Sequence, residues 1–219
     1  MTRRRIYLMR HAQVAYFEDG RPLRPDLVPL TDRGREQARA AAALLDGIHF
    51  DRVITSGLPR TVETARIVAP SSELEAWPEL REIESGRLGE IPEDELEAAF
   101  VGAWRDVVPE ETPFLGGETI RSLLDRVLPA VDRLVADPSW DVVLAVLHGG
   151  VNRAILSHAL TGDRALLGNL EQSPACVNVL DVGEDWVVRA VNHTPYDPTH
   201  LSGRLRTMEE LWREFRATS

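Results

Sequence analysis

Two histidines each follow a short apolar run of the sequence, at the point where a buried strand would end. His11 comes after the run Ile6 to Met9 and Arg10, and His148 directly follows the run Val142 to Leu147. An imidazole can act as a nucleophile or a proton acceptor near neutral pH, and an arginine beside it can bind phosphate oxygens. These residue types can bind a dianion and transfer its phosphoryl group.

Two further residues extend this set of candidates. Arg60 follows an expected strand over 50–55, near a helix start at Pro59, and Glu82 lies at the border of a segment with a different pattern. A histidine-based phosphatase needs a neutral imidazole nitrogen, cationic donors for the non-bridging oxygens, and an acid that protonates the departing oxygen. The sequence offers a candidate for each requirement, although each residue alone is a weak signal.

The elements that must position these residues alternate between strands and helices. Strands are expected over 6–9, 50–55 and 142–147, and a hairpin over 175–182 and 186–191. Helices are expected over 31–47, from Pro59 onward, over 120–134 with a kink at Pro129, over 151–160 and over 208–215. This alternation predicts an α/β fold with three layers, α/β/α, around a mostly parallel open sheet. Such sheets bind ligands beyond the carboxyl ends of their strands, where His11 and His148 would both lie.

A segment after Glu82 departs from the alternation. An expected helix there has prolines on both sides of it. The apolar residues on one face of this helix are Leu96, Ala99, Phe100, Ala103 and Trp104. We interpret residues 83–117 as a small helical cap insertion over the site, in which Phe100 and Trp104 pack within the cap. Residues 1–219 are predicted to form a single domain, because a chain with 43% hydrophobic residues can bury one substantial core.

Composition and charge argue against several classes of function. The net charge of -10 disfavours a nucleic-acid partner, because duplex binding usually needs a basic face. No run approaches the roughly 18 apolar residues of a membrane span, and the apolar run after Arg5 is too short for a signal peptide. The lone Cys176 allows no internal disulfide and no zinc-type spacing of cysteines. We therefore expect a cytoplasmic protein with no membrane partner.

Several motifs along the chain resemble the histidine phosphatase superfamily, which includes the cofactor-dependent phosphoglycerate mutases. The run Leu8-Met9-Arg10-His11-Ala12-Gln13 resembles its signature, and Ser56 to Ala65 resembles its second arginine motif. Leu80-Arg81-Glu82 with Gly86 is similar to the segment that bears the family's acid, and Leu147 to Val151 to its second histidine motif. Two helix entries are also similar, at Leu30 to Ala38 and at Gly116 to Thr119 with Arg126.

The resemblance implies a role for each candidate residue. His11 would attack phosphorus, while Arg10, Arg60 and His148 would hold the phosphoryl oxygens. Glu82 would protonate the leaving group and then act as the base for a water molecule that attacks the phosphohistidine. No metal or other cofactor is expected, since side chains supply the charge stabilisation. A hydrogen bond from the second ring nitrogen of His11 to a carbonyl would fix a neutral tautomer.

Two residues beside the predicted site depart from the family pattern. Ala12 stands where the family usually has Gly, and it would cost on the order of 1 kcal/mol only if the backbone there needs a positive φ. Phe17 places an apolar ring where the mutases commonly carry a polar residue, which makes phosphoglycerate a less expected substrate. Arg21 and Arg24, in the following loop, could recognise a second anionic group, but ordinary surface exposure is the preferred interpretation.

The leading hypothesis is a metal-independent phosphatase that hydrolyses phosphomonoesters of small metabolites. Three alternatives stay open: a cofactor-dependent phosphoglycerate mutase, a protein phosphohistidine phosphatase, and a catalytically silent phosphate-binding module. The expected partner is a small phosphorylated substrate, and a homodimer is left open. The remaining histidines have no predicted role in the chemistry; His158 is expected in the core, His49 in a loop, and His193 and His200 in a late loop.

Overall fold

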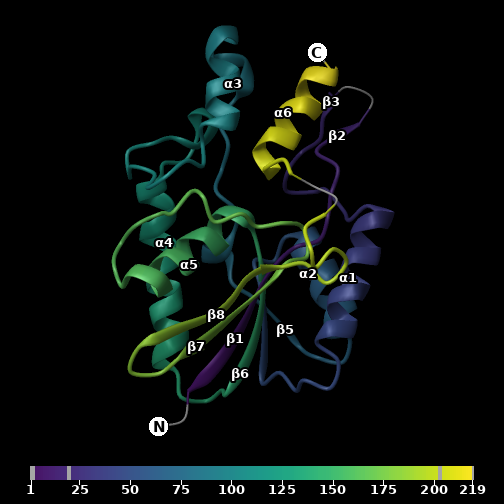
Figure 1. Cartoon of the computed structure of the whole chain (residues 1–219), viewed down its shortest axis with the longest axis vertical. Coiled ribbons are helices and arrows are strands. Elements are labelled where there is room, and N and C mark those ends of the chain that lie inside the picture. Colours follow the sequence, from purple (N-terminus) through teal and green to yellow (C-terminus); the bar gives the residue numbers. More distant parts are fainter. Residues whose placement is uncertain (1–2, 19–20, 202–203, 219) are drawn as a thin grey trace.

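A computed structural model of the protein describes residues 3–18, 21–201 and 204–218. Its centre is a six-stranded sheet in the order β5-β4-β6-β1-β7-β8 (Figure 1). Strands β1, β6, β4 and β5 pair in parallel, while β7 pairs antiparallel with both β1 and β8. The bounds are β1 (Arg4–Arg10), β4 (Arg52–Thr55), β5 (Leu74–Ala76), β6 (Val142–Leu147), β7 (Val177–Val182) and β8 (Trp186–His193). The sheet is mostly parallel, as predicted.

The register of the central strands determines where the candidate residues lie. Arg10, the last residue of β1, pairs with Leu147, the last residue of β6. Thr55, the last residue of β4, pairs with Val146. The carboxyl ends of these three strands therefore meet at one edge of the sheet, and the loops that follow them leave from the same place.

Helices cover both faces of the sheet. On one face, α1 (Asp32–Leu44) and α2 (Pro59–Val68) share a core with Met9, and on the other face α4 (Ile120–Ala136) and α5 (Gly149–Thr161) share a core with Leu8. Neighbouring residues of β1 thus enter opposite cores, as the two-residue period of a strand requires. Figure 1 shows the two pairs of helices on opposite sides of the sheet. The predicted three-layer α/β/α fold is confirmed.

Capping side chains and a proline mark the starts of three helices, as the sequence predicts. The side chains of Thr31 and Thr119 cap α1 and α4, and each accepts a hydrogen bond from the backbone N–H three residues further on, at 2.9 and 3.2 Å. Pro59 occupies the first turn of α2, where a missing N–H has no consequence. Helix α4 continues through Pro129 as one helix.

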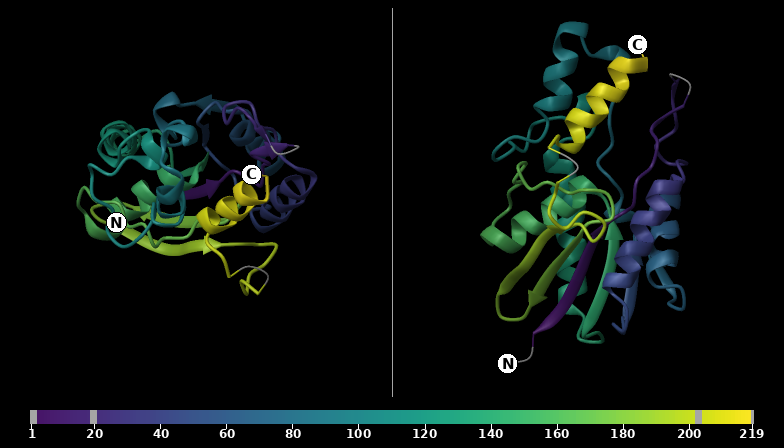
Figure 2. Two further views of the ribbon diagram at one scale, coloured as in Figure 1. Left: turned by 90° about the horizontal axis from the view of Figure 1, so that it is seen from above. Right: turned by 45° about the vertical axis from the view of Figure 1, so that its right-hand side comes forward.

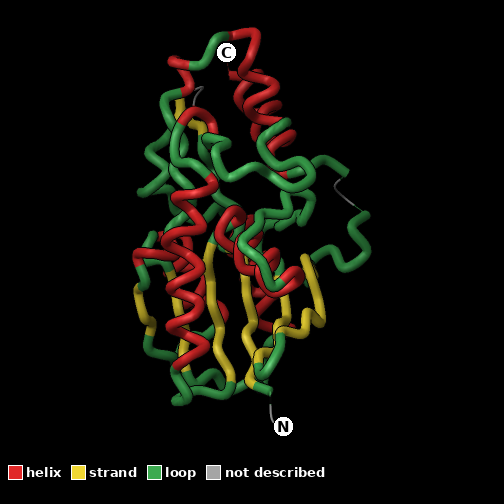
Figure 3. Tube along the Cα trace, turned by 90° about the vertical axis from the view of Figure 1, so that its left-hand side faces the viewer, coloured by secondary structure: helices red, strands yellow, loops and turns green. Residues whose placement is uncertain are grey.

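A smaller group of elements stands over the carboxyl edge of the sheet. Helices α3 (Glu93–Val101) and α6 (Thr207–Thr218) pack side by side there, and the short strands β2 (Phe17–Glu18) and β3 (Arg21–Pro22) form a hairpin nearby (Figure 2). The ring of Phe100 in α3 stacks on Phe215 in α6, with 5.6 Å between centroids. Figure 3 shows that mainly loops connect these upper helices to the sheet below.

The cap differs in one detail from its predicted form. Helix α3 ends at Val101, so Ala103 and Trp104 are not helical, because the chain turns at Gly102. Trp104 is nevertheless buried in the core, as the apolar pattern requires. The interpretation of residues 83–117 as an insertion in a single domain stays a prediction. Within the described ranges, no helix is long and apolar enough to cross a membrane.

Candidate active site

The candidate residues converge at the carboxyl edge of the sheet. His11 directly follows β1, His148 stands between β6 and α5, and Arg60 lies in the first turn of α2. The rings of His11 and His148 meet edge to face, with 5.2 Å between their centroids. All of these side chains are buried, since the exposed fractions are 7% for Arg10, 1% for His11, 2% for Arg60 and 0% for His148.

The imidazole of His11 is held as a neutral nucleophile would be. Its Nδ1 lies 2.8 Å from the carbonyl oxygen of Ala12, to which it can donate a hydrogen bond. The proton then resides on Nδ1, and Nε2 keeps its lone pair and has no hydrogen-bond partner. Burial lowers the pKa of His11 well below its usual range, and the positive charges of Arg60 and Arg10 lower it further. The expected hydrogen bond to a carbonyl is confirmed.

The replacement of the family's usual glycine by Ala12 causes no backbone strain. Ala12 is fully buried, and its N–H donates to the hydroxyl of Thr64 at 3.1 Å. Its φ is not among the positive values of the described non-glycine residues. The methyl group is therefore accommodated in an ordinary conformation, and the cost expected for a positive φ does not arise.

The two predicted arginines are each held by a backbone carbonyl. In Arg10, Nη1 donates to the oxygen of Gln172 at 2.5 Å and to the hydroxyl of Thr207 at 3.1 Å. In Arg60, Nη1 donates to the oxygen of Pro25 at 2.6 Å. The Nε atoms of both side chains are buried without a partner. Each guanidinium is thus fixed at one corner and keeps a donor for a ligand.

His148 receives its orientation from a serine in the second arginine motif. Its Nε2 lies 2.8 Å from Oγ of Ser56, and its Nδ1 has no partner. The hydroxyl of Thr61 donates to the oxygen of Leu58, so the one proton of Ser56 can go either to Thr61, 3.1 Å away, or to Nε2 of His148. When Ser56 donates to Nε2, Nδ1 of a neutral His148 carries the proton and is a donor. Burial lowers the pKa of His148 well below its usual range, with Arg60 as the next cause.

Glu82 reaches the same site from the loop after β5. Its Oε1 accepts hydrogen bonds from the backbone N–H of Ile83 and of Gly150, both at 3.0 Å. A Cβ atom at position 150 would lie only 2.8 Å from this oxygen, so the glycine allows the close approach. The carboxylate therefore sits on the first turn of α5, directly after His148.

Two residues that the sequence indicated only as part of a helix entry hold the Glu82 loop in place. The guanidinium of Arg126 donates to the backbone oxygens of Glu79, Arg81 and Glu82, at 2.7, 2.6 and 3.2 Å. Its Nε and Nη2 also bind the carboxylate of Glu118, both at 2.9 Å. A helix of the α4–α5 face thus fixes the backbone that carries the candidate acid.

A third arginine of the site, Arg153, was not predicted from the sequence. It lies within α5, its side chain is buried, and its Nε has no partner. A Cβ atom at Gly149 would lie 3.2 Å from Nη1 of Arg153 and 3.7 Å from both Nε of Arg10 and Oε2 of Glu82. The three side chains therefore surround one glycine. Arg153 is the one Asp, Glu, Lys or Arg residue of α5, and that was the signal that could have identified it.

The described part of the chain contains five buried side-chain nitrogens without a hydrogen-bond partner, and all five belong to this site. They are Arg10 Nε, His11 Nε2, Arg60 Nε, His148 Nδ1 and Arg153 Nε. An unsatisfied buried polar group costs about 1–3 kcal/mol. Their concentration in one place is therefore typical of a pocket that receives a ligand with several acceptor oxygens.

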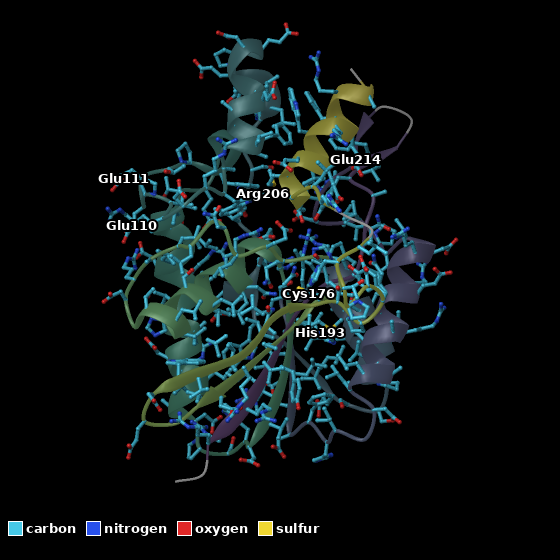
Figure 4. All side chains as sticks on the ribbon, viewed as in Figure 1. Glu110, Glu111, Cys176, His193, Arg206 and Glu214 are labelled. Carbon is cyan, nitrogen blue, oxygen red and sulfur yellow. The ribbon has the colours of Figure 1, made fainter. Side chains whose placement is uncertain are left out.

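The remaining predicted residues lie elsewhere or have other roles. His158 packs against Trp186 and is only partly buried, and His49 is exposed in a loop. His193 ends β8 near Cys176 (Figure 4), and His200 is exposed. These four histidines contribute no side chain to the cluster around His11. Arg24 is exposed, in agreement with the preferred interpretation of its role. The side chain of Arg21 lies outside the described part of the chain.

The cap aromatics have the packing role that the sequence favoured. Phe100 stacks on α6, while Trp104 stacks on Phe114 with 5.2 Å between centroids. Trp104 also lies under the guanidinium of Arg153, 5.1 Å from its carbon to the ring centroid. Its position links the cap to the arginine cluster.

A buried neutral imidazole, a cluster of arginines and a carboxylate define a class of enzyme that transfers phosphoryl groups through histidine. The sequence model of the histidine phosphatase superfamily (branch 1) matches residues 6–194. The chain therefore belongs to the histidine phosphatase superfamily, and the predicted class, a phosphomonoesterase related to the phosphoglycerate mutases, is confirmed.

Curated relatives of the chain include phosphatases and a mutase. The adenosylcobalamin/alpha-ribazole phosphatase of Escherichia coli K12 is 26% identical over 196 residues, which cover 85% of this chain and 94% of that protein. A protein of an Enterobacter species named "Probable phosphoglycerate mutase" is 31% identical over 148 residues, 66% of this chain and 69% of that one.

Solved structures with the same fold are also similar. The mycobacterial glucosyl-3-phosphoglycerate phosphatase, in complex with inorganic phosphate, superposes with a TM-score of 0.69 at 26% identity. The comparison covers 88% of this chain and 98% of that one. Relatives of this protein thus include phosphatases of small phosphorylated metabolites.

Proposed function

We propose that this protein hydrolyses phosphomonoesters of a small metabolite, without a metal, through a phosphohistidine on His11. The observation that carries the proposal is the set of five unpartnered nitrogens in one buried site. A phosphoryl group has three non-bridging oxygens that can accept hydrogen bonds from the three arginine Nε–H groups among them, while Nε2 of His11 supplies the lone pair that attacks phosphorus. The related mycobacterial phosphatase, which has been solved with inorganic phosphate, supports this assignment.

In the first step, Nε2 of His11 attacks phosphorus as the bond from phosphorus to the ester oxygen breaks. The proton stays on Nδ1, which donates a hydrogen bond to the carbonyl oxygen of Ala12, so the ring becomes an N-phosphorylated imidazolium. Arg10, Arg60 and His148 donate to the non-bridging oxygens and stabilise the charge that develops on them. Glu82 gives its proton to the departing alkoxide, which leaves as an alcohol.

In the second step, a water molecule attacks the phosphohistidine from the side that the alcohol has left. Glu82, now a carboxylate, accepts a proton from this water, and the bond between phosphorus and Nε2 breaks. Inorganic phosphate leaves, and His11 returns to its neutral form. Arg153, beside Arg10 and Glu82, adds positive charge at the same place.

The test is a screen of phosphate release over metabolite phosphates in the presence of a chelator, run beside His11→Ala. We expect release from at least one ester by the wild type, with no loss in chelator, and none by the variant. Activity that disappears in chelator, or that persists in His11→Ala, would contradict the mechanism.

Phosphoglycerate mutase activity is the second candidate, because several relatives are named probable phosphoglycerate mutases. A mutase must retain a bisphosphorylated intermediate, whereas a phosphatase admits water. Incubation with 3-phosphoglycerate and the bisphosphate primer separates the two, since a mutase forms the isomer and a phosphatase releases free phosphate. Phe17, partly buried against Phe215 at 6.2 Å between centroids, supports the phosphatase.

A protein phosphohistidine phosphatase and a silent phosphate-binding module have less support. The former must admit a protein side chain, whereas helices α3 and α6 stand over this site (Figure 1). The latter would not need Glu82 or the bonds that hold its loop. A cytoplasmic location and a lack of nucleic-acid partners remain part of the proposal, supported by one buried thiol and a net charge of -10.

A further inference from the structure

Helix α6 contacts the phosphate-binding machinery although it lies beyond the family match, which ends at residue 194. The hydroxyl of Thr207, the first residue of α6, accepts a hydrogen bond from Nη1 of Arg10 at 3.1 Å. It donates its own proton to Oε1 of Glu171 at 2.6 Å. Thr207 therefore connects the C-terminal helix to Arg10.

The two faces of α6 have different surroundings. One face packs against the cap, where Trp212 and Phe215 stack with Phe100 at 5.5 and 5.6 Å between centroids. The other face begins with Thr207 and continues with Glu210 and Glu214, at the spacing that places residues on one side of a helix. Because Thr207 touches Arg10, this face starts at the phosphate pocket and leads away from it. Figure 4 shows Glu214 on α6, well above the sheet.

Glu210 and Glu214 lie one and two turns along α6 from Thr207, and both are exposed. Although part of each side chain is exposed, the neighbouring protein atoms raise the pKa of both carboxyl groups. The negative charge of Glu171 raises the pKa of Glu210 further, while Arg10 and Arg33 act in the opposite direction. Glu210 thus stands one turn beyond Thr207, within electrostatic reach of Arg10 and Arg33.

We propose that α6 forms the leaving-group half of the site, in which Thr207 positions Arg10 while Glu210 and Glu214 select substrates without a second negative charge. This inference rests on the proposed phosphatase function. The preferred substrate class is a phosphate ester of a neutral polyhydroxy alcohol or of an amine-bearing alcohol. A carboxylate or a second phosphate on the leaving group would face two glutamates after the arginines have bound the first phosphoryl group.

A pair of esters with the same carbon skeleton tests the selectivity. Glycerol 3-phosphate and 3-phosphoglycerate differ by one carboxylate, so the ratio of their kcat/KM values reports the effect of that charge. We expect the wild type to prefer glycerol 3-phosphate, and Glu210→Gln with Glu214→Gln to reduce the preference by on the order of fivefold per charge. Glu97→Gln, on the outer groove between α3 and α6, removes the same charge and should leave the ratio unchanged.

Variants of Thr207 test the positioning of Arg10. Thr207→Val removes the hydroxyl at nearly constant volume, and we expect it to raise KM for an aryl phosphate and weaken inhibition by inorganic phosphate. Thr207→Ser keeps the hydroxyl and should restore both values, which a role limited to packing would not do. An aryl phosphate needs little acid assistance, so this readout reports phosphate binding rather than Glu82.

The outcomes separate this inference from the proposed function. If the wild type releases phosphate from none of the esters, the proposed function fails and this inference fails with it. If the wild type hydrolyses the aryl phosphate but the glutamate variants leave the ratio unchanged, only the selectivity is overturned. A wild-type preference for 3-phosphoglycerate would also overturn it, and would instead favour recognition of a second anion by Arg21 and Arg24. Equal values for Thr207→Val and Thr207→Ser would overturn the positioning of Arg10.

Discussion

His11 and His148 are both buried, and both have a pKa well below the usual value of 6.5. Burial is the main cause in each, because removal from water disfavours the charged imidazolium. The neutral form of His11 therefore persists at pH values at which an exposed histidine is already protonated. The proposed nucleophile therefore stays unprotonated in mildly acidic solution.

The same shifts predict how the stability of the protein depends on pH. Below pH 6.5 the unfolded chain binds protons at these two histidines and the folded protein does not, so stability falls as the pH falls from that value. Each histidine lowers the free energy of unfolding by up to about 1.4 kcal/mol for each unit by which the pH falls. Urea unfolding in phosphate-free buffer at several pH values measures the dependence. His11→Asn should make this dependence shallower, and a dependence equal to that of the wild type would contradict the explanation.

Gly150 allows a second prediction about a single residue. The Cβ atom of Gly150→Ala would lie 2.8 Å from Oε1 of Glu82, so this flexible carboxylate must move. We expect kcat for an alkyl phosphate to fall on the order of 10- to 100-fold, within the range that general acid catalysis contributes. Alanine stabilises a helix by up to about 1 kcal/mol relative to glycine, so the melting temperature of the variant should not fall.

Gly89→Ala is the matched control for this prediction. A Cβ atom at Gly89 has no neighbour within 4 Å, and the residue lies in the cap segment. Its kcat should equal that of the wild type. Equal kcat values for Gly150→Ala and the wild type would show that the position of Glu82 does not limit catalysis.

At the scale of the elements, α4 holds the loop of Glu82 through Arg126. Arg126→Gln removes hydrogen bonds to three backbone oxygens and the ion pair with Glu118. We expect kcat to fall strongly for alkyl phosphates, which need a proton on the leaving oxygen, and weakly for an aryl phosphate with a good leaving group. Steady-state kinetics with both esters measures the difference.

Arg121→Gln provides the comparison on the same helix. Arg121 is exposed and pairs with Glu110 and Glu111, away from the Glu82 loop. Arg121→Gln should leave kcat for both the alkyl and the aryl phosphate near the wild-type values. If Arg126→Gln lowered the two rates by the same factor, Arg126 would act on stability or on phosphate binding and not through Glu82.

The elements that position the histidines were predictable because each carries a local signal. Buried strands such as β1 and β6 are short apolar runs. Thr31 and Pro59 stand at the starts of the two helices that they predict, α1 and α2. The end of α3 was predicted too far along the chain, because the buried Trp104 continues the apolar period after the helix has stopped. An apolar pattern reports burial and does not by itself report helical backbone.

The parts of the site that were not predicted depend on contacts between distant segments. Thr207 and Arg10 are 197 positions apart, and Arg126 binds a loop 44 to 47 positions before it. Motifs that resemble a family identified Arg10, His11, Arg60, Glu82 and His148, which the structure brings together. No local pattern indicates that a C-terminal helix returns to the first strand.

At the scale of the whole molecule, the site lies between the sheet edge and the upper helices, and its side chains come from segments throughout the chain. Ligand binding should therefore stabilise the whole fold. A ligand at about 100 times its Kd adds about 2.7 kcal/mol, which raises the melting temperature of a domain of this size by roughly 5 to 10 °C. Inorganic phosphate should produce such a shift, with chelator present or absent.

Arg60→Ala should abolish most of this shift, because it removes one of the buried donors. Differential scanning calorimetry over a phosphate titration measures it. A shift of equal size in Arg60→Ala, or one that needs a metal ion, would place the phosphate elsewhere.

The central claim is that His11 carries the phosphoryl group during turnover. Its most direct test mixes the enzyme with a substrate in chelator, quenches the reaction in base, where phosphohistidine survives, and locates the added phosphoryl group by peptide mass spectrometry. The predicted result is a phosphoryl group on the peptide that contains His11, absent when His11→Ala is treated in the same way. Phosphate release with no phosphorylated peptide at any reaction time, or a phosphoryl group on another residue, would contradict this mechanism.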